Sequence, residues 1–172
     1  MKILNTATLT LLALSIPAAL AEEHSAEEYH RHHVAALVSG SHSGEKNGFT
    51  VGGDYEFRFA RPIGVTVTGE YVGGGFREDL VAFTATVHPW KGLKLQAGPG
   101  FDHELRRHET EAAEGESAAH QKVNRALFRV GGGYDIEVGK NMTIGPDFAY
   151  DILKGERVVV YGVTIGFGFG RR

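Results

Sequence analysis

The chain has 172 residues, the length of one ordinary domain, so its fold must be explained by a single core. It contains no cysteine, which excludes disulfides, thiolate zinc sites and cysteine nucleophiles. Its formal net charge is −3 and its basic residues are scattered along the chain, so no nucleic-acid partner is expected.

Residues 1–21 have the pattern of a secretory signal peptide. Lys2 supplies a positive start, Ile3–Leu20 is an apolar stretch, and Ala19-Leu20-Ala21 is a small-x-small cleavage pattern. Polar residues interrupt the stretch and no basic flank follows it, which disfavours a membrane anchor. We expect cleavage after Ala21, which removes the charge of Lys2 and changes the net charge from −3 to −4.

Residues 22–33 form a His/Glu-rich lead before the first predicted strand. Neutral imidazoles with nearby carboxylates bind Zn, Cu or Ni, and the candidate metal ligands here are His24, His30, His32 and His33. Their spacing matches no fixed coordination motif. Two interpretations therefore stay open, a divalent-metal site and a solvated polar lead, and no other cofactor is indicated.

From Val34 onward, apolar and polar residues alternate in segments of about ten residues, which predicts strands. Short connections (60–62, 88–92 and 139–141) alternate with longer polar ones (43–47, 74–78 and 105–123). No later stretch reaches the roughly 18 apolar residues that a membrane helix needs. Eight strands are predicted, at Val34–His42, Gly48–Phe59, Ile63–Gly73, Asp79–Trp90, Leu93–Glu104, Asn124–Val138, Met142–Ile152 and Arg157–Phe169.

The predicted strands have one bulky apolar face and one small polar face. A soluble barrel with an apolar cavity would also alternate, so the sizes of the side chains must decide which face is inside. Glycine contributes 24 residues, roughly twice its usual share, and much of it lies on the small face. Because eight strands leave a narrow interior, we expect the small face inside and the bulky face against lipid.

Charged residues on the small face should pair inside the lumen, since an unpaired charge there is costly. Both signs are present in the predicted strands. The cations are Arg58, Lys94, Arg125 and Arg129, and the anions are Asp54, Glu56, Glu70, Asp102, Asp135, Glu137, Asp147 and Asp151. A lumen plugged by polar residues is the expected result.

This pattern resembles the small eight-stranded outer-membrane barrels of the OmpA and OmpX type over residues 34–172. Tyr161–Phe167 is similar to the closing-strand signal that the barrel-assembly machinery recognises, although Gly170-Arg171-Arg172 here follow the usual terminal aromatic residue. The resemblance implies an all-β, antiparallel, up-and-down transmembrane barrel in the outer membrane of a Gram-negative-type bacterium. Its expected neighbours are outer-membrane lipid and lipopolysaccharide, with the barrel-assembly machinery during insertion, and a monomer is expected.

The fold by itself does not choose a function, because barrels of this size serve several. Asp102-His103-Glu104 is the nearest approach to a catalytic grouping, and no serine lies beside it in the sequence, so we expect no enzyme activity. The favoured function is a structural or interaction role at the cell envelope. Two alternatives are metal binding through the His-rich lead and passage of small solutes through the lumen.

Overall fold

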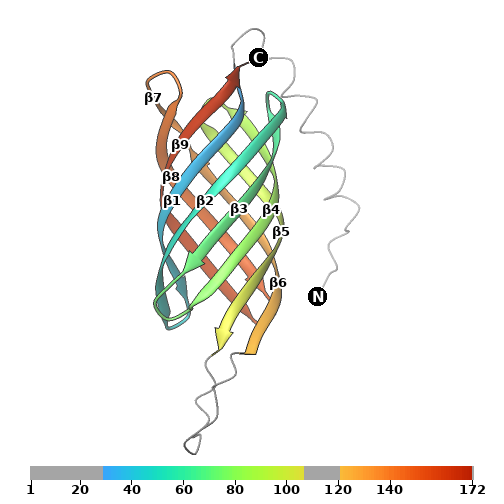
Figure 1. Cartoon of the computed structure of the whole chain (residues 1–172), viewed down its shortest axis with the longest axis vertical. Helices are drawn as coiled ribbons and strands as arrows, with labels where there is room; N and C mark the ends of the chain where they lie inside the picture. Colours follow the sequence, from blue (N-terminus) through green and yellow to red (C-terminus); the bar gives the residue numbers. More distant parts are fainter. Residues whose placement is uncertain (1–28, 107–120, 172) are drawn as a thin grey trace, which may run out of the picture.

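The computed structural model describes residues 29–106 and 121–171, where a single antiparallel sheet curls into an upright barrel (Figure 1). The predicted signal peptide, His24 and most of the 105–123 connection lie outside these residues. Within them no helix is long and apolar enough to cross a membrane. The strands are β1 (His30–Ser43), β2 (Lys46–Ala60), β3 (Ile63–Val72), β4 (Glu78–Trp90), β5 (Leu93–Arg106), β6 (Gln121–Tyr134), β7 (Ile136–Val138), β8 (Met142–Leu153) and β9 (Glu156–Arg171).

The barrel is closed by pairing between its first and last strands. Residues His30 to His42 of β1 pair antiparallel with Val159 to Arg171 of β9. Elsewhere in the sheet β6 pairs directly with β8, and the short β7 also pairs with β8, so β7 continues β6 as one interrupted strand. If β6 and β7 are counted as one strand, the described residues form eight strands around the barrel, which confirms the predicted eight-stranded antiparallel barrel.

Most predicted strand boundaries lie within two residues of those in the structure, and two predicted strands, the first and the sixth, differ more. The sixth predicted strand, Asn124–Val138, is interrupted at Asp135 and appears as β6 and β7. The first strand begins at His30 rather than Val34, because β9 extends to Arg171 and offers backbone partners to His30 and His32. The last residues of the predicted lead are thus part of the barrel wall.

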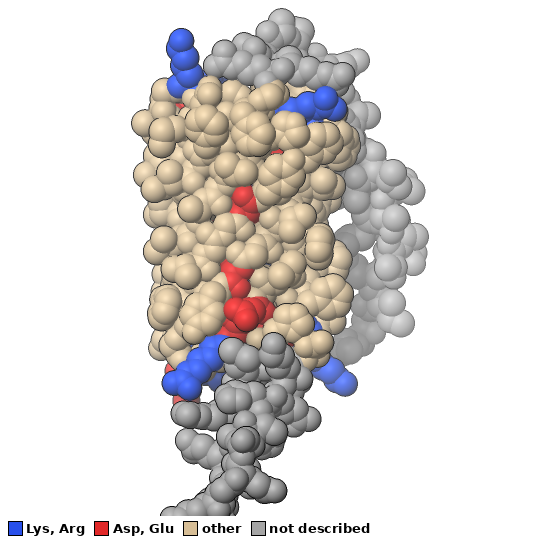
Figure 2. All heavy atoms as spheres, in the orientation of Figure 1, with Lys and Arg blue, Asp and Glu red and all other residues tan. Residues whose placement is uncertain are grey.

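Side chains alternate between the two faces of the wall as predicted. Buried and exposed residues alternate from Gly64 to Val72 and from Glu78 to Thr86, and the exposed set includes Val67 and Phe83. The buried residues, which face the lumen, include threonines such as Thr66 and Thr86. In the view of Figure 2 lysines and arginines lie at the two ends of the barrel, and uncharged side chains cover most of the middle. The bulky apolar face is confirmed as the outer one.

The glycine excess has a steric cause. A Cβ on Gly166 of β9 would lie 2.3 Å from Nε2 of His33, and a Cβ on Gly98 of β5 would lie 2.1 Å from the Phe83 carbonyl oxygen. Real Cβ atoms do not approach other atoms so closely, so any other residue would displace the neighbouring strand or side chain. Glycine at these positions lets a narrow barrel close around charged side chains.

Replacing Val67 by arginine tests the lipid-facing assignment. Val67 lies in the middle of β3 and is 42% exposed, where a charge facing the hydrocarbon should cost about 2–4 kcal/mol of unfolding free energy. The matched control Val138→Arg, at the end of β7 beside a turn, should cost about 0–1 kcal/mol because it lies near the interface. Urea unfolding in lipid vesicles measures both, and equal costs would contradict the assignment.

Candidate functional site

The lumen contains charged side chains at four levels, numbered here from the end that carries the short turns (60–63, 90–93 and 138–142). At the first level the Glu56 carboxylate accepts hydrogen bonds from Arg58 Nε at 3.0 Å and from His88 Nε2 at 2.6 Å. At the second, Lys94 Nζ lies 3.5 Å from carboxylate oxygens of both Asp54 and Asp147. The Lys94 side chain is 2% exposed, so these contacts replace its hydration.

The third level is the most completely paired. Arg129 donates two hydrogen bonds to Glu70, at 2.6 and 2.7 Å, and two to Asp151, both at 2.7 Å. All three side chains are at most 2% exposed. This planar bidentate geometry matches a guanidinium to two carboxylates. It holds β3, β6 and β8 together across the lumen.

The fourth level lies near the loop end, opposite the short turns. Arg125 donates to Glu78 at 2.7 Å, to Asp102 at 2.9 Å and to Glu156 at 3.0 Å. The predicted internal pairing of charges is confirmed for Arg58, Lys94, Arg125 and Arg129. It is wrong for Glu137, an exposed residue of β7 that pairs instead with Lys91 at 3.3 Å. The chain turns at Asp135 and carries β7 beyond the level of the other lumen charges.

An apolar cluster fills the lumen between and above the last two levels, and sequence reasoning missed it. It encloses a cavity of only about 10 Å³ beside Glu78, Asp102 and Asp151. The alternation of the strands could have revealed it, because Leu80, Leu127 and Leu153 each lie two residues from a lumen charge and therefore share its face. We call it the apolar cap, and its members are Val72, Phe76, Leu80, Ala82, Leu127, Ala149, Leu153, Val158 and Val160.

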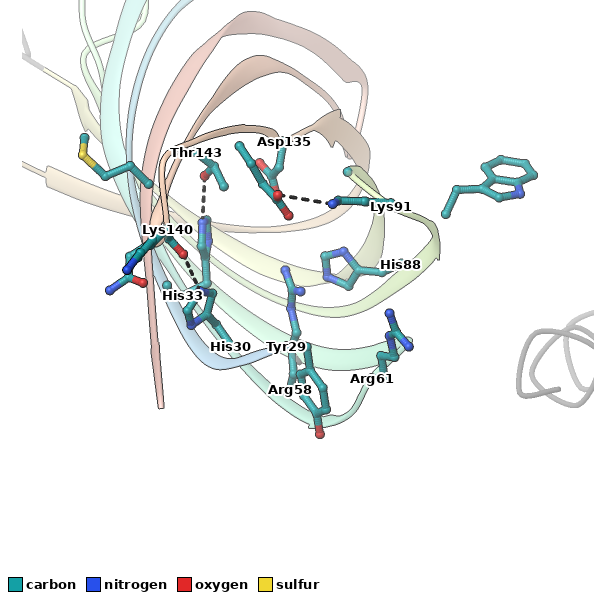
Figure 3. Close-up of a pocket in the computed structure, with 16 residues that line it drawn as sticks. Tyr29, His30, His33, Arg58, Arg61, His88, Lys91, Asp135, Lys140 and Thr143 are labelled. Atoms are coloured by element: carbon teal, nitrogen blue, oxygen red, sulfur yellow. Dashed lines mark hydrogen bonds and ion pairs between the residues drawn. The ribbon is translucent and has the colours of Figure 1, made fainter. Parts of the chain in front are cut away.

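The short-turn end, by contrast, opens into a cavity of about 370 Å³. We call this cavity the short-turn mouth. In Figure 3 the side chains of His33, Arg58 and His88 come from different strands and lie around the same opening, with Asp135 and Lys91 above them in the view. Among the described residues, the lumen is thus filled by apolar and paired charged side chains toward the loop end and opens into a polar cavity at the short-turn end.

The structure separates two of the candidate metal ligands, His32 and His33, while His30 and His33 line the same cavity and His24 lies outside the described residues. His32 lies on the outer face, where its ring stacks on Phe169 with 5.0 Å between centroids and its Nδ1 hydrogen bonds to the Tyr55 hydroxyl at 2.8 Å. His33 points to the lumen, where Nε2 hydrogen bonds to Thr143 Oγ1 at 3.0 Å. One ion cannot bind both rings, and the described residues contain no metal-holding group of three His, Cys, Asp or Glu.

The Asp102-His103-Glu104 grouping is also separated by strand alternation. Asp102 is 1% exposed and pairs with Arg125 in the lumen. His103 is on the outer face and hydrogen bonds through Nδ1 to the side-chain oxygen of Asn124. Adjacent residues of a strand point to opposite faces, so this acid cannot orient this imidazole. Asp102 and His103 therefore do not form an acid–imidazole pair.

Removing the cation at the third level tests the energetic role of the lumen charges. In Arg129→Met the carboxylates of Glu70 and Asp151 stay buried with no counter-charge, which should cost about 3–5 kcal/mol of unfolding free energy. The control Lys91→Met breaks a pair whose side chains are 69% and 60% exposed and should cost at most about 1 kcal/mol. Urea unfolding in vesicles measures the unfolding free energy of both variants. A loss of about 1 kcal/mol or less in Arg129→Met would show that the paired lumen charges contribute little to stability.

Comparison with known proteins bears on the fold. No family model matches the chain, and no curated protein matches it. Among solved structures, the N-terminal β-barrel domain of Pseudomonas aeruginosa OprF is 15% identical, with a TM-score of 0.52, covering 82% of this chain and 100% of that one. The outer membrane protein Ail of Yersinia pestis is 16% identical, with a TM-score of 0.51, covering 81% and 99%. Together with the closed antiparallel sheet and its apolar exterior, these similarities identify the fold as that of the small eight-stranded outer-membrane β-barrels.

Proposed function

We propose that this chain is a non-enzymatic outer-membrane protein with a structural or interaction role at the cell envelope, and that its lumen does not conduct solutes. The observation that carries the proposal is the sealed loop end of the lumen. The apolar cap leaves about 10 Å³ there, and the buried Arg129 pairs lie directly beneath it. A solute would have to displace both, so function is assigned to the surfaces of the barrel.

Membrane insertion is supported by the exterior of the wall. Bulky side chains such as Phe83 (49% exposed), Phe148 (49%) and Ile165 (53%) cover it, which water would not favour. In lipid a closed barrel satisfies all backbone hydrogen bonds within the wall. The similarity of fold to barrels from two bacterial outer membranes supports the same location here.

The loop end is braced in a way that suits a recognition surface. Glu156, at the start of β9, accepts from Ser43 at 3.2 Å and Arg125 at 3.0 Å, and pairs with Lys46 at 3.5 Å. The Lys46 ammonium also lies 5.7 Å from the ring of Phe76, in the connection before β4. One cluster therefore ties three connections and β6 together, and a rigid rim loses little entropy on binding a partner.

The alternative functions receive less support. Solute passage would need an open path past the apolar cap. Metal binding through the lead would need ligands other than the pair His32 and His33, which lie on opposite faces of β1.

Planar-bilayer recording tests the closed lumen. The refolded chain should give no resolved current steps, because the apolar cap excludes ions and the charges beneath it are paired. A wide-pore porin in the same lipid serves as the positive control. Uniform, reproducible current steps from the pure protein would overturn the proposal and favour passage of small solutes.

Single cysteines test the orientation in the membrane, which is convenient because the chain has none of its own. In intact cells a membrane-impermeant maleimide should label Lys154→Cys, in the exposed turn between β8 and β9, and should miss Lys91→Cys in the short turn between β4 and β5. Permeabilising the outer membrane should make both react. The reverse pattern in intact cells would overturn the assignment of the loop end to the outside.

A further inference from the structure

The outer face of the barrel carries a cluster of aromatic rings at the short-turn end, where β1, β2 and β9 lie side by side. The imidazole of His32 stacks on Phe169 with 5.0 Å between ring centroids, and it also lies 5.3 Å from the ring of Phe57 and 6.1 Å from the ring of Tyr55. The Tyr55 hydroxyl hydrogen bonds to Nδ1 of this imidazole at 2.8 Å. Aromatic side chains gather at the interfaces of a bilayer, so this cluster marks the level of the lipid headgroups.

Arg31 of β1 joins this cluster. Its guanidinium carbon lies 5.3 Å from the centroid of the Phe57 ring, which is a cation–π contact. The next residue, His32, contacts the same ring, although neighbouring residues of a strand normally face opposite sides. Gly170, opposite Arg31 on β9, has a φ of 70°, so the wall departs from regular strand geometry at this point. The departure places a cation and an imidazole together on the outer face.

The guanidinium of Arg31 has no oxygen partner among the described residues. Its Nε is buried without a hydrogen-bond acceptor, and no described carboxylate forms an ion pair with it. The four cations of the lumen, by contrast, each contact at least one carboxylate. Buried polar atoms normally find a partner, so an oxygen acceptor from the surroundings is the missing element at Arg31.

Gly170 leaves space for such an acceptor. A Cβ at this position would lie 2.8 Å from Cδ2 and 3.5 Å from Nε2 of His32, and 3.6 Å from Cβ of Arg31. The absence of a side chain therefore keeps a position open beside both residues. When the Tyr55 hydroxyl donates to Nδ1 of His32, the hydrogen of the neutral ring is on Nε2, which is then a second donor beside the guanidinium.

The occupant must match both the charge and the surroundings of this position. A guanidinium binds phosphate oxygens through two parallel hydrogen bonds. The cluster is on the outer face, at the end of a wall whose bulky side chains face lipid, so an anion that reaches it is carried by a lipid. Val34 and Phe167, paired across β1 and β9 and exposed on the same face, offer an apolar surface to the acyl chains of that lipid.

We propose that Arg31 and His32 form a binding site for the phosphate of a glycerophospholipid at the short-turn end of the barrel. Arg31 supplies the charge and His32 the second donor, and Gly170 leaves the room that the phosphate occupies. In the proposed orientation this headgroup belongs to the periplasmic leaflet. The inference rests on insertion of the barrel in a membrane, but it holds whether or not the lumen conducts, so it can fail separately from the proposed function.

Native mass spectrometry of the refolded chain, residues 22–172, in a non-ionic detergent tests the site. Dioleoylphosphatidylglycerol is titrated into the protein, and dioleoylglycerol, which has the same acyl chains and no phosphate, is the matched lipid. The phospholipid should bind at least about tenfold more tightly than dioleoylglycerol, because only its phosphate can accept hydrogen bonds from a charged donor. Equal binding of the two lipids would overturn the proposal.

Three variants locate the binding. R31Q should weaken binding of the first phosphatidylglycerol molecule about tenfold or more, because it removes the charged donor. G170A should also weaken it, because the new methyl group takes the space beside His32 while every charge is kept. The control R157Q, an exposed arginine near the start of β9 at the loop end, should leave it unchanged, and circular dichroism with heat-dependent gel mobility checks that each chain folds. Unchanged binding in both R31Q and G170A, or an equal loss in R157Q, would overturn the proposal.

Discussion

Closure of the sheet, through the pairing of β1 with β9, is the constraint on which the rest of this molecule depends. A membrane offers no water to unpaired backbone groups, so every strand must have two neighbours. Eight strands satisfy that rule with the narrowest useful ring, whose interior admits side chains and little else. The narrow ring in turn requires glycine where walls and side chains approach closely, as at Gly166 beside His33.

Burial in a narrow lumen makes each internal charge dependent on a partner, and the partners differ along the length of the barrel. Arg129 is held by two bidentate carboxylates and Lys94 is shared between two others. Above them the apolar cap needs no partners at all. At the short-turn end a cavity of about 370 Å³ remains. The two ends of one barrel therefore have different chemistry: apolar side chains pack beside paired charges toward the loop end, and a polar cavity lies at the short-turn end.

Neighbouring residues of one strand show how much the two-residue alternation of side chains explains by itself. His32 and His33 are the same residue type, yet His32 stacks on Phe169 outside the barrel and His33 hydrogen bonds to Thr143 inside it. Asp102 and His103 are divided in the same way. Both separations follow from the two-residue period of a strand once its limits are known. His32 and His33 are divided because β1 begins at His30, and Asp102 and His103 are divided because β5 extends through His103. Metal binding by the lead, which also includes His24, stays a prediction.

By itself the sequence determined the number of strands, which face of each strand points outward, and which charged residues lie in the lumen in most cases. Period-two patterning, side-chain size and glycine content are local properties of the sequence. Only the tertiary structure decided which charges meet. Arg129 and Glu70 are far apart in sequence, and their contact depends on the curvature of the sheet and on its register. The apolar cap and the short-turn mouth arise in the same way, from side chains of several strands that share a height in the barrel. That height is fixed by strand register and tilt around a closed ring, which no single segment encodes.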